Sequence, residues 1–392
     1  MQKLDPEALK RMLRTIVDAR RHMDGLYHPE GIAIRQTLHD ALDPDRVRNA
    51  EARIAHVARA RTALVTRNAP SHLMKLDLHA PLDFAFSMQQ LLDVAKTQDK
   101  TRKAMMLRSE ATMLFDGALF VQLYDELRSE RDRRMTCDAF SRSVQEAFFV
   151  GEGNQRFWSV HNPAKFYTTE SVSFHRNTAG AQRMVRSWDV YSRKVRVPGI
   201  HRDVWIIFLS RPKDPASIYF KVLLNAEDPL RANNPLTIHD EGGFKLFVVE
   251  SDEERAKDLV RALLQQVQTH AQELGATITE ELSGNLLAPP NTKADSRNPS
   301  SRPTYKVLKF IAQLNDVSIE VQGQTLRAFA DQEVAVTDAN HAFYELEKCV
   351  NSHFPRFFPT RAFGIEWNKT EYEKLERLRR QTLGLLSAYE NP

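Results

Sequence analysis

The sequence has few cysteines and no long apolar run, and both absences narrow what the chain can be. Its two cysteines, Cys137 and Cys349, lie far apart among 392 residues, so no disulfide framework is expected and a reducing compartment is favoured. No uninterrupted apolar stretch approaches the roughly 20 residues that span a membrane, and the first residues lack the apolar core of a signal peptide. We therefore expect a cytoplasmic protein with no membrane partner.

The chain also lacks a strong excess of charge of either sign. Its 55 lysines and arginines stand against 51 aspartates and glutamates, which leaves a formal net charge of +4. So slight an excess is not typical of a general nucleic-acid coat, and any basic function must therefore be local. A length of 392 residues allows two or three domains with ample hydrophobic core.

Residues 1–150 are predicted to form an all-helical N-terminal domain. Asp5-Pro6 is a typical helix start, and apolar residues follow it at helical spacing. Further helical patterns cover about 45–66 and 83–127. The pair His39-Asp40 stands at what reads as a helix end without other ligands at a suitable spacing, so we interpret it as a surface pair and not as a metal site.

A second domain with α/β character is predicted over 151–350, followed by a helical extension over 351–392. After short β-type runs near 157–160 and 171–174, a helix is expected at Arg183–Arg193. The elements expected after it are strand Val204–Leu209, helix Ser217–Asn225, strand Gly243–Glu250, a helix with a capping box of Ser251 and Glu254, and strands Tyr305–Leu314 and Val317–Gln322. Asn315-Asp316 between the last two strands predicts a two-residue hairpin turn.

The stretch from Ser210 to Lys221 gathers positive charge at the end of a predicted buried strand. It contains Arg211, Lys213 and Lys221, with the hydroxyl of Ser217 between them. Arginine offers a planar fork of donors and lysine a compact charge, so such a strand end suits a polyphosphate. A solvated basic loop is the alternative interpretation, because short runs of charge are usually surface.

Four further pieces follow the basic stretch in a fixed order, and together they resemble a known family. The complete set is Arg211/Lys213/Ser217/Lys221, Asp240/Gly243/Lys245, Tyr305, Glu320/Gln322/Thr325 and His341/Tyr344. In this order they are similar to the synthetase domain of the RelA/SpoT family, the alarmone (p)ppGpp synthetases, over roughly residues 200–350. The resemblance implies an α/β fold with a mixed, nucleotidyltransferase-like sheet behind the all-helical N-terminal domain.

Two carboxylates stand where the resembled family has its catalytic pair. Asp240 precedes one predicted strand, and Glu320 lies on the polar face of another, together with Ser318 and Gln322. Mg²⁺ is usually held by one or two carboxylates together with substrate phosphates and water. The resemblance implies that Asp240 and Glu320 bind Mg²⁺ and activate the attacking hydroxyl. Without it, an exposed Glu320 and an Asp240 that caps a strand would be the simpler interpretation.

The resemblance also implies the residues that bind each nucleotide. Those on the ATP side are Arg211, Lys213, Ser217, Lys221 and Lys245, and those on the acceptor side are Tyr305, Gln322 and His341. Tyr305 matches the tyrosine that stacks on the acceptor base, although an aromatic residue that opens a strand is more often part of the core.

Four residues depart from the family pattern. Lys245 replaces the usual arginine and loses its planar fork of donors. Gly323-Gln324 replaces Ile-Arg and removes one cation, and Thr304 replaces the glycine before the tyrosine.

The favoured function is Mg²⁺-dependent transfer of pyrophosphate from ATP to the 3′-hydroxyl of GDP or GTP. One alternative is a toxin-type relative that modifies tRNA 3′ ends or adenine nucleotides, with tRNA held by Lys293, Arg297 and Arg302 in the proline-rich stretch 284–303. Another alternative is a non-catalytic nucleotide sensor. The N-terminal helical domain is expected to bind a regulator or to act as an inhibitory module.

Overall fold

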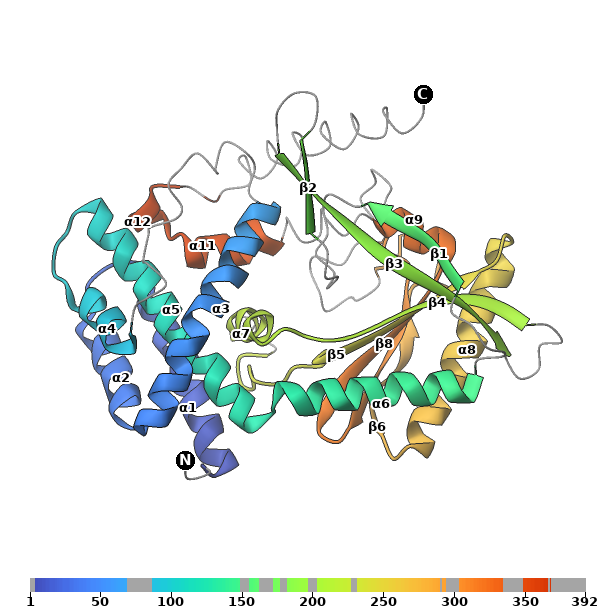
Figure 1. Cartoon of the computed structure of the whole chain (residues 1–392), viewed down its shortest axis with the longest axis horizontal. Coiled ribbons are helices and arrows are strands. Elements are labelled where there is room, and N and C mark those ends of the chain that lie inside the picture. The colour runs from blue at the N-terminus through green and yellow to red at the C-terminus, as the bar shows by residue number, and fades with distance from the viewer. Residues whose placement is uncertain are drawn as a thin grey trace. The chain divides into compact units, whose positions relative to one another are not determined.

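The chain forms two compact units, which are described separately (Figure 1). The helical unit comprises Met1–Glu130, Asp214–Ile238 and Leu346–Pro392, and the sheet unit comprises Arg131–Lys213 and His239–Glu345. The computed structural model describes residues 4–68, 87–148, 155–161, 172–176, 182–196, 203–226, 231–289, 291–293, 303–333, 348–365 and 367.

The helical unit is built around α5 (Arg102–Leu127), which is buried on all sides between Arg108 and Tyr124. Gly117 makes this close packing possible, because a Cβ there would lie only 2.7 Å from Val57 Cγ1 and 3.1 Å from the ring of Tyr219. The other elements of the unit are α1 (Pro6–Ala19), η1 (Arg20–His22), α2 (Pro29–Asp40), α3 (Pro44–Asn68), α4 (Met88–Lys96), α7 (Pro215–Asn225), η2 (Cys349–His353), α11 (Phe354–Phe357) and α12 (Thr360–Phe363).

The predicted helical character of the N-terminal region is confirmed. Helix α1 begins after Asp5, whose side chain accepts a hydrogen bond from the Ala8 amide. Helix α3 covers the predicted run 45–66, and α4 and α5 lie within the run 83–127, although residues 69–86 are outside the described part of the chain. His39 and Asp40 end α2 as a surface pair, as the sequence indicated.

The sheet unit contains a mixed sheet, and its strand order is β1-β3-β4-β5-β8-β7-β6 with β2 paired to β3. Only β5 and β8 pair in parallel among the strands described. The elements are α6 (Glu130–Phe148), β1 (Gln155–His161), β2 (Val172–Arg176), β3 (Gln182–Arg196), β4 (Asp203–Pro212), β5 (Gly242–Val249), α8 (Glu253–Glu273), β6 (Thr277–Gly284), β7 (Leu308–Leu314), β8 (Val317–Thr325) and α9 (Leu326–Glu333).

One face of the sheet carries the hydrophobic core of its unit. Phe244 and Leu246 of β5 pack there with residues of α6 and α8, such as Phe140 and Leu263. Side chains alternate across a strand, so the neighbouring positions of β5 and β8 point to the opposite face. That opposite face is where Lys245, Glu320 and Gln322 lie.

Three local predictions in the sheet unit were wrong. The strand expected to begin at Tyr305 begins at Leu308, so Tyr305 lies before β7 and not in it. The segment Arg183–Arg193 is part of strand β3 and not a helix, because it pairs with β1, β2 and β4. Helix α8 is capped one residue later than predicted: Asp252, not Ser251, accepts from the Arg255 amide. The predicted boundaries at 150 and 350 remain predictions, and packing groups α7 with the helical unit.

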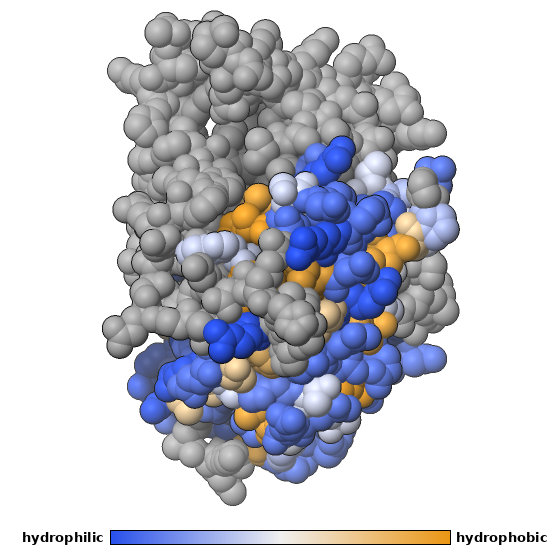
Figure 2. Space-filling view, turned by 90° about the vertical axis from the view of Figure 1, so that its right-hand side faces the viewer, coloured by the Kyte–Doolittle hydropathy of each residue, from blue (hydrophilic) through white to orange (hydrophobic). Residues whose placement is uncertain are grey.

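Where residues are described, the face seen from the right of Figure 1 is mostly hydrophilic (Figure 2). Apolar atoms appear there as separate spots among polar side chains, wherever residues are described. Large hydrophobic side chains that are exposed among the described residues are Tyr27, Met135 and Leu274. The described helices include none that is both long enough and apolar enough to cross a membrane.

Candidate active site

The polar face of the sheet begins with the hairpin of β7 and β8. Asn315 and Asp316 form its turn with φ values of 48° and 62°, the left-handed conformation that two-residue hairpin turns require. Counting outward from this turn pairs Lys309 with Gln322 and Ile311 with Glu320. The prediction of a hairpin, with Glu320 and Gln322 on one face, is confirmed.

A chain of hydrogen bonds orients the carboxylate of Glu320. Gln322 Nε2 donates to Glu320 Oε2 at 2.7 Å, and the Tyr305 hydroxyl donates to Gln322 Oε1 at 3.3 Å. Lys309 Nζ forms an ion pair with Glu320 Oε1 at 3.1 Å. Both partners are partly accessible, with 17% and 20% of their side chains exposed. Of the predicted acceptor residues, Gln322 therefore contacts the predicted catalytic carboxylate directly, and Tyr305 contacts it through Gln322.

Strand β5 adds a second cation and a glycine to this face. In the parallel register, Gly243 lies opposite Glu320 and Lys245 lies opposite Gln322. Residues paired in this way project from the same face of a sheet and lie close together. Because Gly243 has no side chain, nothing from that position covers Glu320.

The second carboxylate lies just before β5 and also has a lysine partner. Lys213 Nζ binds Asp240 Oδ2, and these side chains are 25% and 24% exposed. Lys213 follows the last residue of β4, whose register with β5 places Arg211 opposite Gly243. The sheet unit thus collects Arg211, Lys213 and Asp240 at the edge where β4 ends and β5 begins.

Ser217 and Lys221 belong to α7, which packs in the helical unit. Asp214 caps this helix, and its Oδ1 accepts from the amides of Ala216 and Ser217 at 2.9 and 3.1 Å. Its Oδ2 pairs with His56 Nε2 at 3.0 Å, and this contact raises the pKa of His56 above its usual value. Ser217 itself is exposed at the first turn of the helix.

Four predicted residues fall outside the described part of the chain. These are His341 and Tyr344 of the H-x-x-Y pair, and Arg297 and Arg302 of the proline-rich stretch. Lys293 of the same stretch is described and exposed.

Sequence reasoning missed Lys309 as a member of the site. Its neighbours Leu308 and Phe310 are buried on the opposite face, so the alternation along β7 already marks Lys309 as polar-facing. Hairpin counting then places it beside Gln322. At position 324 this chain has glutamine in place of the family's arginine, and Gln324 is buried and donates to the Lys306 carbonyl at 2.7 Å. Lys309 supplies a cation on the same hairpin.

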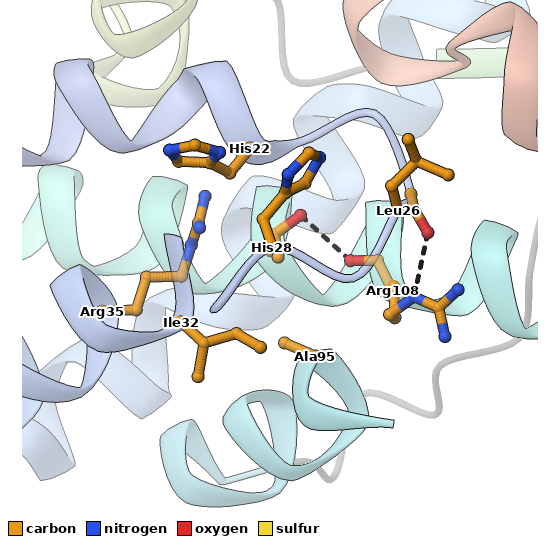
Figure 3. A pocket seen from close by; sticks show the side chains of 9 residues that line it. His22, Leu26, His28, Ile32, Arg35, Ala95 and Arg108 are labelled. Atoms are coloured by element: carbon orange, nitrogen blue, oxygen red, sulfur yellow. Dashed lines mark hydrogen bonds between the residues drawn. The ribbon is translucent and has the colours of Figure 1, made fainter. Parts of the chain in front are cut away.

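The helical unit contains a small cavity that is unrelated to these residues (Figure 3). His22 and His28 line it, with ring centroids 4.9 Å apart, together with Arg35 and Arg108. Both guanidinium groups are already hydrogen-bonded: Arg35 Nε to Asp116 Oδ1 at 2.9 Å and Arg108 Nε to the Gly25 carbonyl at 2.9 Å. The space is sufficient for about one water molecule and not for a nucleotide.

Comparisons with protein-family models, curated proteins and solved structures give no significant match to this chain. The fold that the structure defines is a mixed α/β sheet unit with an N-terminal helical region.

Proposed function

We propose that the chain transfers pyrophosphate from ATP to the 3′-hydroxyl of a guanine nucleotide with Mg²⁺. The observation that carries the proposal is the polar face of the sheet, where Tyr305, Gln322 and Glu320 form one hydrogen-bonded chain flanked by lysines. Three segments contribute to it: β5 with Lys245, the residues from Tyr305 to Lys309, and β8 with Glu320 and Gln322. A merely solvated surface gives no reason for such a hydrogen-bonded chain.

The carboxylates fit a magnesium site that is completed by substrate. Asp240 and Glu320 are both partly accessible and would supply one oxygen ligand each. The described residues contain no group of three or more His, Cys, Asp or Glu side chains that could hold a metal. Because Mg²⁺ is commonly held by one or two carboxylates plus phosphates and water, this limited donor set is sufficient. Bound there, the ion would neutralise phosphate charge.

The cations of the sheet unit fit the polyphosphate. Lys213 and Lys309 each neutralise a carboxylate in the structure, and both ammonium groups can turn to phosphate oxygens when a nucleotide enters. Lys245 lies between them on the same sheet. In phosphoryl transfer, positioning and electrostatic stabilisation supply most of the catalysis. Several lysines near the phosphates would provide this stabilisation.

The chemical step follows from the position of Glu320. The 3′-oxygen of the acceptor attacks the β-phosphorus of ATP, the bond from that phosphorus to the α,β-bridging oxygen breaks, and AMP leaves with the electron pair. Glu320 accepts the proton of the attacking hydroxyl. Its orientation by Gln322 and Lys309 prepares it for this role. The ring of Tyr305, next to Gln322, would stack on the acceptor base.

The test is transfer of label from ATP. The protein is incubated with Mg²⁺, ATP labelled in its β-phosphate and, in separate reactions, GDP, GTP, AMP, ADP or tRNA. We expect labelled GDP or GTP products together with an equal amount of AMP. Glu320→Gln is expected to be inactive, and Glu254→Ala, which changes an exposed carboxylate of the same unit, is expected to retain activity. Absence of AMP release with every acceptor would refute the proposal, and label on tRNA alone would replace its acceptor.

A further inference from the structure

Glu241 lies between Asp240 and the first residue of β5, and the proposed reaction does not use it. It is fully buried, at 0% exposure, whereas the side chains of Asp240 and Glu320 are 24% and 20% exposed. Carboxylates are rarely buried unless polar partners hold them, because removing the charge from water is costly. The burial of Glu241 therefore indicates that specific polar partners hold its carboxylate.

Glu241 connects the ends of three strands. Its backbone carbonyl accepts a hydrogen bond from the Lys213 amide at 2.6 Å, directly after β4. Its side-chain Oε2 accepts one from the Ser318 amide at 3.1 Å, at the second residue of β8. Glu241 itself immediately precedes β5. One residue thus contacts both segments that carry the candidate catalytic groups.

The consequence of these contacts is a fixed spacing between those groups. Ser318 stands two residues before Glu320 on β8, so a displaced Ser318 amide moves Glu320 along with it. On the other side, Lys213 binds Asp240. The backbone next to Glu241 has little freedom, because a Cβ at Gly242 would lie 2.4 Å from Cys137 Sγ. The turn is therefore packed against α6, and Glu241 transmits that fixed position to β8.

We propose that Glu241 is a positioning residue, which sets the place of Glu320 relative to Asp240 by holding the Ser318 amide. This inference rests on the proposed function, in which Glu241 would act without touching the substrate. In this role Glu241 supplies an oxygen acceptor at the right distance from the backbone.

Two substitutions separate the acceptor's position from the charge. Glu241→Gln keeps an oxygen at the same distance and removes the charge, whereas Glu241→Asp keeps the charge and withdraws the oxygen by one methylene. We expect kcat of Glu241→Gln to stay within about threefold of wild type. For Glu241→Asp we expect kcat to fall about 100-fold with KM for ATP little changed, because a shift of about 1 Å can cost that much. The matched control is Glu254→Ala on α8, whose side chain is 83% exposed.

Amide hydrogen exchange at Ser318 gives a readout that does not depend on activity. We expect faster exchange of this amide in Glu241→Asp and wild-type exchange in Glu241→Gln and in the control. Normal kcat and normal Ser318 exchange in Glu241→Asp would overturn the inference, as would equal damage in Glu241→Gln. If the wild-type protein releases no AMP from ATP, the proposed function fails, while Ser318 exchange still decides whether Glu241 holds β8.

Discussion

A buried ion pair of the helical unit differs from the two ion pairs at the candidate site of the sheet unit. In the helical unit, Arg35 and Asp116 form a pair with side chains only 1% and 0% exposed, and Arg35 also donates to the carbonyls of Gly31 and Ala19. In the sheet unit, the pairs of Lys213 with Asp240 and of Lys309 with Glu320 remain 17–25% exposed.

The difference lies in the cation as well as in the burial. A guanidinium binds a carboxylate through two parallel bonds and can saturate its remaining donors on backbone carbonyls, as Arg35 does. An ammonium on a flexible stem is a point charge that exchanges partners easily. The comparison teaches that the buried pair of Arg35 and Asp116 is structural, whereas the accessible pairs at the candidate site are available to a ligand.

Removing a carboxylate from the sheet unit should abolish activity and spare the fold. We expect Glu320→Ala or Asp240→Ala to lower kcat by at least about 100-fold, because groups that act as a unit lose most of the rate together. Stability should change by less than about 1 kcal/mol, since partly exposed ion pairs contribute little. AMP release and urea unfolding measure the two effects. Near wild-type turnover in either variant would show that the site is wrongly assigned.

Removing a carboxylate from the helical unit should have the reverse effect on stability. Asp116→Ala leaves the guanidinium of Arg35 buried without its carboxylate, and breaking a buried pair costs about 3–5 kcal/mol. The control is Asp45→Ala, whose carboxylate is 54% exposed and pairs with an exposed Arg48, and there we expect less than about 0.5 kcal/mol. Urea unfolding of both variants provides the test, and equal stability would contradict the structural role of the buried pair.

Acid should weaken the helical unit through His353. Burial lowers the pKa of this histidine from 6.5 to about 3, and its ring stacks on Phe357 at 5.9 Å. Below pH 6.5 the unfolded chain binds a proton that the folded histidine does not, so stability is lost as the pH falls from 6.5 toward 3. The loss is about 1.4 kcal/mol per pH unit from this group. His353→Phe should show a flatter decline in urea unfolding between pH 7 and 5; an unchanged slope would refute the assignment.

The sheet unit also shows how far sequence reasoning reaches. Alternation and turn chemistry are local, so the hairpin at Asn315-Asp316 and the polar face with Glu320 could be predicted. Strand β3 was not predicted, because the pairing of Arg183–Arg193 with β1, β2 and β4 overrides a helical pattern. The burial of Glu241 could not be predicted for a similar reason. A charged residue beside two glycines is expected at the surface, and only the tertiary hydrogen bond with the Ser318 amide explains why Glu241 is buried.

Among the predicted nucleotide-binding residues, too, some positions were predictable from the sequence and others depend on tertiary packing. Tyr305 and Gln322 were assigned one by one through the resemblance, and their hydrogen bond joins a residue that precedes β7 to one within β8. Ser217 and Lys221 followed from their distance to Lys213 in sequence. No local pattern reveals that α7 packs with the helical unit through Tyr219 against Phe120, because this requires the tertiary contacts of α5.

The smallest expected effect tests whether the accessible pairs are exchangeable. Lys309 neutralises Glu320, so a cation that binds this carboxylate must first displace the ammonium. Lys309→Met removes that competition, and we expect the affinity for Mn²⁺, used as a probe for Mg²⁺, to rise by up to about fivefold in the absence of nucleotide, since a partly exposed pair is worth at most about 1 kcal/mol.

With ATP present we expect Lys309→Met to bind Mn²⁺ more weakly than wild type, because the lost ammonium no longer neutralises phosphate. Lys257→Met on α8, whose lysine pairs with Glu254, is the control and should change neither affinity. Calorimetric titration with and without ATP measures both. Equal Mn²⁺ affinity in Lys309→Met and wild type would mean that the pair with Glu320 does not compete with metal, and the distinction between structural and exchangeable pairs would then rest on burial alone.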